Sequence, residues 1–171
     1  MLILTASHQR NLALAEAVHG EARRQVIPAT LVDLTTLALP LYSSRRDDED
    51  PGDDLRSLEE RMAGARGLWI CVPEYNGGVP PTLTNAIAWL SRRSTDFRAL
   101  FNGKPVVLST HSGGSGQKVL SALRVQLAHL GCLVLGRELL TNPQRPLNPA
   151  SLKALMAQLG ALLGSAVAPP R

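Results

Sequence analysis

The stretch Gly67–Arg92, which reads GLWICVPEYNGGVPPTLTNAIAWLSR, decides the fold of this chain. It begins with an unbroken apolar run, Leu68–Val72, which is typical of a strand that is covered on both faces of a sheet. Pro73 ends this run, and a loop with two adjacent glycines follows. A pair of prolines then starts a segment whose apolar residues recur at helical spacing. The stretch therefore predicts a strand, a tight loop and a helix, a junction at which open α/β sheets commonly bind ligands.

Strand and helix signals alternate along the rest of the chain. The predicted strands are Leu2–Thr5, Ala29–Leu34, Leu68–Val72, Lys104–Thr110 and Leu133–Leu135. The predicted helices are Asn11–Gln25, Leu55–Ala65, Pro80–Arg93, Gln117–Leu130 and Ser151–Leu163. This α/β alternation predicts a doubly wound, five-stranded parallel sheet with helices on both faces, and the flavodoxin-like order 2-1-3-4-5 is its natural solution. No repeat or linker divides the sequence, so we expect a single domain over residues 1–171.

Composition narrows the classes of partner. The formal net charge is +4 and only 4% of the residues are aromatic. Because the arginines are scattered and aromatic residues for base stacking are few, nucleic acid is not an expected partner. Cys71 and Cys132 lie in apolar segments without metal-ligand or C-x-x-C spacing, which predicts buried, reduced thiols. With no signal peptide and no apolar run of membrane-spanning length, we expect a cytoplasmic protein without a membrane partner.

Two loops of the predicted sheet should share one ligand. In the order 2-1-3-4-5, the loops after the first and third strands flank the point where the winding reverses. The first loop contains Ser7, Arg10 and Asn11 at the start of a helix, whose free N–H groups and dipole favour a phosphate. A simple capping role for Ser7 or Asn11 is the alternative for this loop.

The third-strand loop and the helix after it resemble the NADPH-dependent FMN reductase family, flavodoxin-like flavoenzymes that include quinone, azo-dye and chromate reductases. The matching positions are Pro73, Glu74, Tyr75, Asn76, Leu83, Asn85, Ala86, Ile87 and Trp89. An ordinary tight connection would explain the prolines and glycines but not this whole combination. The resemblance implies FMN as cofactor, NADPH or NADH as co-substrate, and a homodimer or tetramer.

The resemblance also implies a flavin site built from three loops. Ser7, Arg10 and Asn11 would hold the phosphate, although this loop is shorter than the family's and has Ala6 in place of a glycine. The ribityl chain and one ring edge would contact Pro73, Glu74, Tyr75, Asn76 and Gly77. The other side would be closed by Ser112, Gly113 and Gly114, a loop that alone would also fit a flexible connector.

Three more residues are expected at the substrate cleft: Tyr42, Arg45 and His111. Tyr42 ends a segment that resembles the family's stretch over the flavin, Arg45 could meet a nucleotide phosphate, and His111 flanks the proposed flavin site. The acidic run 47–54 lacks an EF-hand pattern and is interrupted by a proline and a glycine, so we expect a solvated loop and no metal site.

Together these features predict an FMN-dependent oxidoreductase that passes hydride from NADPH or NADH through FMN to a flavin, quinone or similar small-molecule electron acceptor. Because the cofactor carries the chemistry, no side chain is assigned as catalytic. Two alternatives remain. One is a flavodoxin-type electron carrier, although such carriers are usually acidic and this chain is basic. The other is a non-catalytic flavin-binding or sensor protein.

Overall fold

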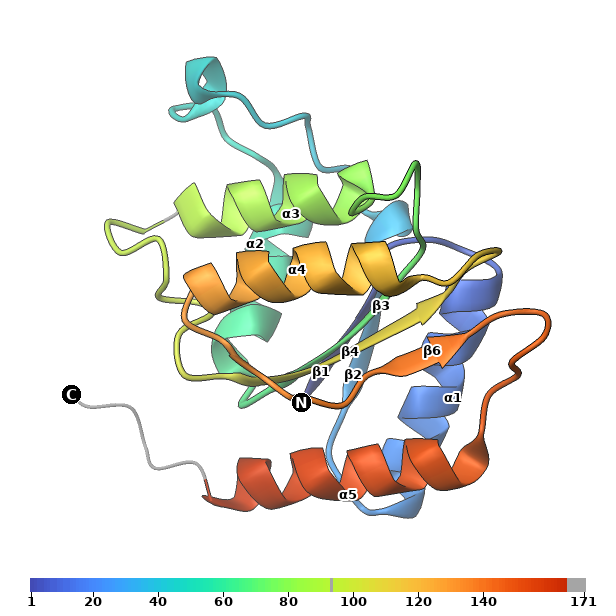
Figure 1. Cartoon of the computed structure of the whole chain (residues 1–171). Coiled ribbons are helices and arrows are strands. Elements are labelled where there is room, and N and C mark those ends of the chain that lie inside the picture. The colour runs from blue at the N-terminus through green and yellow to red at the C-terminus, as the bar shows by residue number, and fades with distance from the viewer. Residues whose placement is uncertain (93, 166–171) are drawn as a thin grey trace.

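The computed structural model describes residues 1–92 and 94–165 (Figure 1). Arg93, predicted to end the third helix, and residues 166–171 lie outside this described part. The strands are β1 (Leu2–Thr5), β2 (Thr30–Asp33), β3 (Leu68–Val72), β4 (Pro105–His111), β5 (Leu133–Val134) and β6 (Leu139–Thr141). The helices are α1 (Arg10–Arg24), α2 (Asp53–Gly64), α3 (Pro81–Arg92), α4 (Gln117–His129) and α5 (Pro149–Ser165). Two 3-10 turns, η1 (Leu34–Thr36) and η2 (Ser44–Arg46), lie between β2 and α2.

The sheet has the order β2-β1-β3-β4-β5 with every pair parallel, which confirms the predicted flavodoxin-like topology. The sequence did not predict β6. It pairs with the carboxyl half of β4, at Ser109–His111, whereas β5 pairs with Pro105 and Val106. Because β5 is much shorter than β4, the end of this edge of β4 is left free for β6. The expected fifth strand is therefore β5, and β6 is an additional short strand on the same edge of β4.

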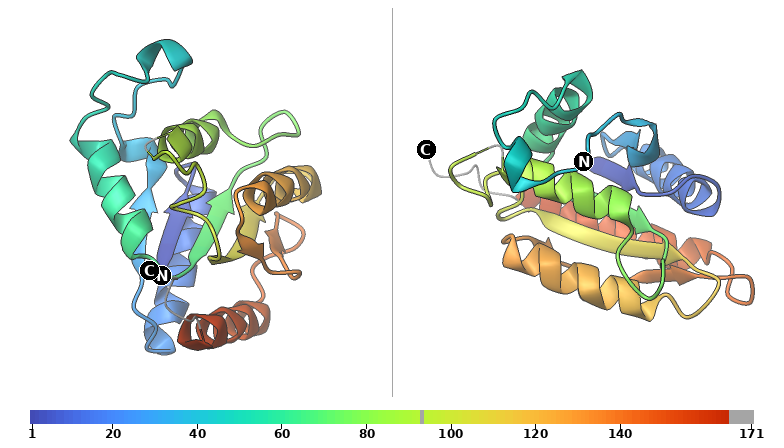
Figure 2. Two further views of the ribbon diagram at one scale, coloured as in Figure 1. Left: turned by 90° about the vertical axis from the view of Figure 1, so that its left-hand side faces the viewer. Right: turned by 90° about the horizontal axis from the view of Figure 1, so that it is seen from above.

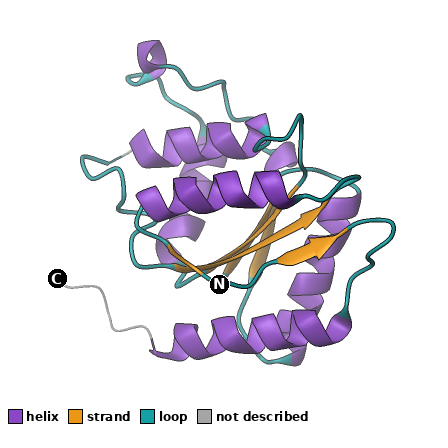
Figure 3. Ribbon diagram, viewed as in Figure 1, coloured by secondary structure: helices purple, strands orange, loops and turns teal. Residues whose placement is uncertain are grey.

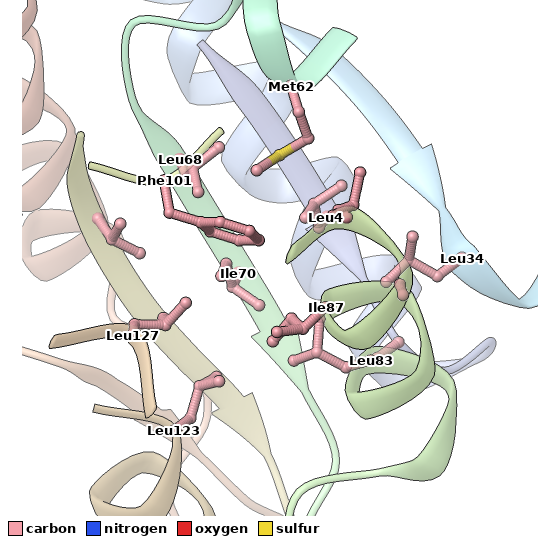
Figure 4. Packing of buried hydrophobic residues seen from close by; sticks show 14 of the residues in the cluster. Leu4, Leu34, Met62, Leu68, Ile70, Leu83, Ile87, Phe101, Leu123 and Leu127 are labelled. Carbon is pink, nitrogen blue, oxygen red and sulfur yellow. The ribbon is translucent and has the colours of Figure 1, made fainter. Parts of the chain in front are cut away.

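Alternation along the strands builds two apolar layers. In β3, Leu68, Ile70 and Val72 belong to the cluster under α2, α3 and α4, whereas Trp69 and Cys71 belong to the cluster against α1 and α5. This is the period of two that a strand dictates. Figure 4 shows the first cluster, and Figure 2 shows α3 and α4 side by side above the sheet with α5 below it. A strand buried on both faces explains why Leu68–Val72 is apolar at every position.

Both cysteines are free and buried, as predicted. Burial raises the pKa of the Cys71 and Cys132 thiols to about 12. The thiolate is the reactive form of cysteine, so neither side chain is poised for reaction.

None of the helices in the described part of the chain combines the length and apolar character that crossing a membrane requires.

Candidate functional site

The loops after β1, β3 and β4 meet at the carboxyl edge of the sheet. In Figure 1 the arrowheads of β4 and β6 point to the end of the molecule at which α1 begins, and Figure 3 shows the loops gathered there. Side-chain hydrogen bonds join the loops in pairs. The predicted site residues on these loops are therefore brought to one edge.

Asn11, in the first turn of α1, joins the first loop to the end of β4. Its Nδ2 donates to the carbonyl oxygen of His111 at 3.0 Å, and its Oδ1 accepts from the His111 amide at 2.8 Å. Asn11 is almost fully buried. Both polar ends of this side chain thus bind backbone, so the Asn11 side chain positions the two loops.

The start of α1 carries no side-chain cap. The N-cap residue is Gln9, which has a φ of 65° and makes no capping hydrogen bond through its side chain. The alternative of a capping role for Ser7 or Asn11 is therefore wrong. Ser7 is only 9% exposed, and its carbonyl oxygen accepts from the Thr5 hydroxyl at 2.9 Å. The amide groups at a helix start favour an anion when no side chain caps them, and Ser7 lies beside these amides.

The β3 loop ends in a tight reversal. Tyr75 and Gly78 exchange two backbone hydrogen bonds, of 3.2 and 2.9 Å. Asn76 and Gly77 between them have φ values of 52° and 74°, the conformation of a type I′ turn, which Asn-Gly favours. The Tyr75 side chain is left half-exposed at this loop.

Glu74 connects this turn to the β4 loop. Its carboxylate accepts from the backbone N–H of Val119, in the first turn of α4, at 3.4 Å. The N-cap position of α4 is Gly116, which has no side chain to supply a cap. An acidic group is favourable near a helix N-terminus, so Glu74 stabilises the start of α4 from the neighbouring loop.

The β4 loop is fastened by residues that the sequence did not indicate. The Ser112 amide donates to the Thr141 carbonyl oxygen at 3.1 Å, and Asn142 Nδ2 donates to the Gly114 carbonyl oxygen at 3.4 Å. Thr141 ends β6 and Asn142 follows it. Because β6 itself gave no recognisable strand signal, nothing in the sequence placed these residues at the site.

His111 lies between Arg10 and Thr141. Arg10 Nη1 is 3.4 Å from His111 Nε2, and His111 Nδ1 is 3.0 Å from the Thr141 hydroxyl, which itself donates to the Thr110 carbonyl oxygen. Arginine only donates, so Nε2 must be the acceptor, and Nδ1–H then donates to Thr141. Burial, and secondarily the Arg10 charge, lower the pKa of His111. The contacts and the lowered pKa both favour the neutral ring.

Tyr42 packs against α3. Two residues of the family motif, both on α3, hold this part of the chain in place. Asn85 accepts from the Tyr42 amide at 2.8 Å and donates to the Pro40 carbonyl oxygen at 3.0 Å, while Trp89 Nε1 donates to the same oxygen at 2.7 Å. The rings of Tyr42 and Trp89 meet edge to face with centroids 5.3 Å apart. Asn85 and Trp89 therefore anchor the β2–α2 loop, residues 37–52.

Arg45 does not lie with the candidate residues at the carboxyl edge of the sheet. It lies in η2, two residues before Asp47, which forms a 2.9 Å ion pair with Arg92 in the last turn of α3. The carboxyl edge of the sheet lies at the other end of α3, where that helix begins (Figure 1). Arg92 and the Tyr42 hydroxyl hold the pKa of Asp47 below its ordinary value. Among the described residues, no three His, Cys, Asp or Glu side chains form a metal-binding group.

The donor set at this edge fits a flavin mononucleotide. The uncapped start of α1 offers amide donors to a phosphate. At Gly113 and Gly114 an added Cβ would meet no atom within 4 Å, so the backbone there is open to close approach by a planar group. The loop after β3, with its turn at Tyr75–Gly78, is linked to the start of α4 through Glu74.

The chain is similar to known proteins over most of its length. The model of a family described as NADPH-dependent FMN reductase matches residues 1–145, which include all three loops. A Burkholderia 2-hydroxy-1,4-benzoquinone reductase is 35% identical over 101 residues, covering 58% of this chain and 54% of that protein. The quinone reductase of Escherichia coli K12 is 36% identical over 102 residues, covering 58% and 53%. The chain thus spans about half the length of these curated relatives.

Solved structures support the fold. FerB, a flavoenzyme NAD(P)H:(acceptor) oxidoreductase from Paracoccus denitrificans, superposes with a TM-score of 0.73 at 19% identity, covering 95% of this chain and 94% of that chain. A flavodoxin from the domain Archaea has a TM-score of 0.65 at 11% identity, covering 95% and 97%. At these identities the likeness is one of fold alone.

Proposed function

Because the chain belongs to the NADPH-dependent FMN reductase family, we propose that it is an FMN-dependent oxidoreductase that uses NADPH or NADH to reduce a small acceptor such as a quinone or a flavin. The observation that carries the proposal is the meeting of three loops at one edge, with uncapped helix amides on the first and open glycine backbone on the last. The names of the curated relatives, quinone reductases among them, support the class of acceptor.

In this proposal the protein binds and orients, and bound FMN supplies the hydride chemistry. Ser7 and the first amides of α1 hold the phosphate, and Asn11 fixes their position relative to β4, whereas the Arg10 side chain is turned toward His111. The loop Pro73–Gly77 contacts the ribityl chain and ring edge, with half-exposed Tyr75 limiting access of water. Ser112–Gly114 closes the other side. The family resemblance supports a cytoplasmic homodimer or tetramer.

Steady-state kinetics test the function. If donor and acceptor use one flavin site in turn, double-reciprocal plots of initial rate against NADPH concentration are parallel at several quinone concentrations. Intersecting lines would contradict a shared site. A protein that binds FMN but oxidises neither NADPH nor NADH would be an electron carrier or a sensor.

Two substitutions at Ser7 test the phosphate position. Ser7→Ala removes one charge-assisted hydrogen bond, which costs about 1.5 to 3 kcal/mol, roughly 10- to 150-fold in FMN affinity. Ser7→Asp adds repulsion between a carboxylate and the phosphate, so its loss should be larger. Titration of apo-protein by quenching of FMN fluorescence measures both. Unchanged affinity in Ser7→Asp would remove Ser7 from the site.

A further inference from the structure

A separate pocket lies beside the proposed flavin site, between α1 and residues 142–147. Its volume is about 430 Å³, within the range of roughly 300–1,000 Å³ that small-molecule sites occupy. Ala13 and Leu14 of α1 form one wall, and Pro146 and Leu147 form the other. Figure 1 shows the segment that follows β6 passing beside α1 before α5 begins. Both walls are therefore apolar, and the volume of the pocket is sufficient for a single ring.

One end of the pocket is polar and positively charged. It is formed by Arg10, His111 and Asn142. Within the described part of the chain, no carboxylate lies in ion-pair distance of Arg10, and no acidic residue lines the pocket. Other arginines of the protein, such as Arg92 with Asp47, do pair with an acid.

The partner of Arg10 explains why its charge remains available. The guanidinium donates to the neutral Nε2 of His111, so the imidazole orients Arg10 without neutralising it. A guanidinium has five N–H donors in a planar fork, and this contact uses one of them. The remaining donors can bind a carboxylate through two parallel hydrogen bonds.

The flavin does not account for this pocket. The residues that line it come from α1, from the ends of β4 and β6, and from the segment after β6. Neither the β3 loop, at residues 73–79, nor Ser112–Gly114 contributes any of them. A ring held between these two segments would therefore lie outside the pocket walls.

We propose that this pocket is a second ligand site, for a small organic anion in which a carboxylate is attached to one apolar ring. The carboxylate binds Arg10, with the Asn142 amide beside it, and the ring lies between α1 and Leu147. This pocket is additional to the proposed sites for the flavin and the acceptor. Ligand binding to it can be measured without turnover, so it is tested separately from the proposed function.

The test uses benzoate as probe and benzamide as its neutral isostere, each titrated by calorimetry into the FMN-loaded protein. We expect saturable binding of benzoate and at least about tenfold weaker binding of benzamide, since a charge-assisted hydrogen bond is lost. FMN affinity and NADPH oxidation are measured on the same preparation. If benzoate binds but the protein neither binds FMN nor oxidises NADPH, the proposed function alone is overturned.

A matched pair at His111 isolates the charge. His111→Gln supplies a neutral oxygen acceptor to Arg10 and should keep benzoate binding. His111→Glu introduces a side chain of the same shape as glutamine that neutralises Arg10. It should therefore lower benzoate affinity about tenfold or more. Ala13→Phe, on the exposed wall of the pocket, should block benzoate by filling the space while FMN still binds.

Three results would overturn the proposal. Benzoate and benzamide could bind equally, or the Glu and Gln variants could bind benzoate equally, or Ala13→Phe could leave binding unchanged. Displacement of FMN by benzoate would place the anion on the flavin phosphate site and would also contradict a separate pocket.

Discussion

The Asn11 side chain binds the backbone of His111 as a neighbouring strand would, accepting from its N–H at 2.8 Å and donating to its carbonyl oxygen at 3.0 Å. β1 and β4 are not neighbours in the sheet, because β3 lies between them. This contact therefore bridges two loops that the sheet does not join. It fixes where the first turn of α1 lies relative to the β4 loop, and hence the width of the proposed flavin site.

Asn11→Asp should lower both stability and FMN affinity. The new oxygen faces the His111 carbonyl oxygen in a buried position, so one hydrogen bond is replaced by a repulsive contact. We expect a loss of about 1 to 3 kcal/mol in the free energy of unfolding, measured in urea. Gln158→Glu, the same chemical change on the exposed face of α5, should stay within about 0.5 kcal/mol of the parent. Equal stability of Asn11→Asp and the parent would contradict the bridging role.

The lowered pKa of His111 predicts a pH dependence of stability. As the pH falls, the unfolded chain takes up a proton at this residue at a higher pH than the folded chain does. The contribution of His111 to the free energy of unfolding is therefore fully present above the ordinary histidine pKa and is lost as the pH drops below it. Between about pH 7 and about pH 5, the melting temperature of the parent should therefore fall more than that of His111→Gln. All other titrating groups are shared, so the difference reports His111. Parallel curves would show that the folded protein does not disfavour the charged ring.

The main features of this fold could be predicted from local patterns, whereas the details of the site depend on distant contacts. The apolar run Leu68–Val72 and the βα alternation determine the strand order, and the order brings the loops to one edge. In contrast, β6 forms because β5 leaves part of the edge of β4 free, which no local signal in residues 139–141 indicates. Likewise, the bonds of Asn85 and Trp89 go to the backbone of Pro40 and Tyr42, some 40 positions earlier.

Asn85→Ala should loosen the β2–α2 loop. The variant loses two hydrogen bonds to the loop backbone, each contributing about 1 kcal/mol, so the population of the open loop should rise roughly 30-fold. Trypsin can then cut after exposed Arg45, and the initial rate of cleavage should rise in proportion to the open population. Mass spectrometry of the fragments measures this rate. Thr82→Ala, in the first turn of the same helix, should leave it unchanged, and an unchanged rate in Asn85→Ala would mean that Asn85 does not hold the loop.

Val26→Gly should stabilise the protein. Val26 follows the last turn of α1 with a φ of 56°, in the position that Gly131 occupies after α4 with a φ of 86°. Both helix ends show the same pair of closing hydrogen bonds, Val26 N–H to Arg23 O and Ile27 N–H to Ala22 O in α1. A left-handed conformation costs a β-branched residue about 1 to 2 kcal/mol, and glycine's entropy offsets about half of that.

The net gain in the free energy of unfolding should be about 0.5 to 1 kcal/mol, because Val26 is 88% exposed and few contacts are lost. Val125→Gly is the matched control. Val125 is also exposed but lies inside α4, where glycine should destabilise by a few tenths of a kcal/mol. The same sign for both substitutions would rule out strain at Val26 as the cause.

The central claim is that the three loops hold an FMN that accepts hydride from a nicotinamide nucleotide and passes it to a small acceptor. The direct measurement is the visible spectrum of the FMN-loaded protein without oxygen, first with one equivalent of NADPH or NADH, and then with a quinone. The account predicts that the absorption of oxidised flavin disappears with the nucleotide and returns with the quinone. A protein that fails to quench FMN fluorescence, or a bound flavin whose spectrum neither nucleotide changes, would contradict it.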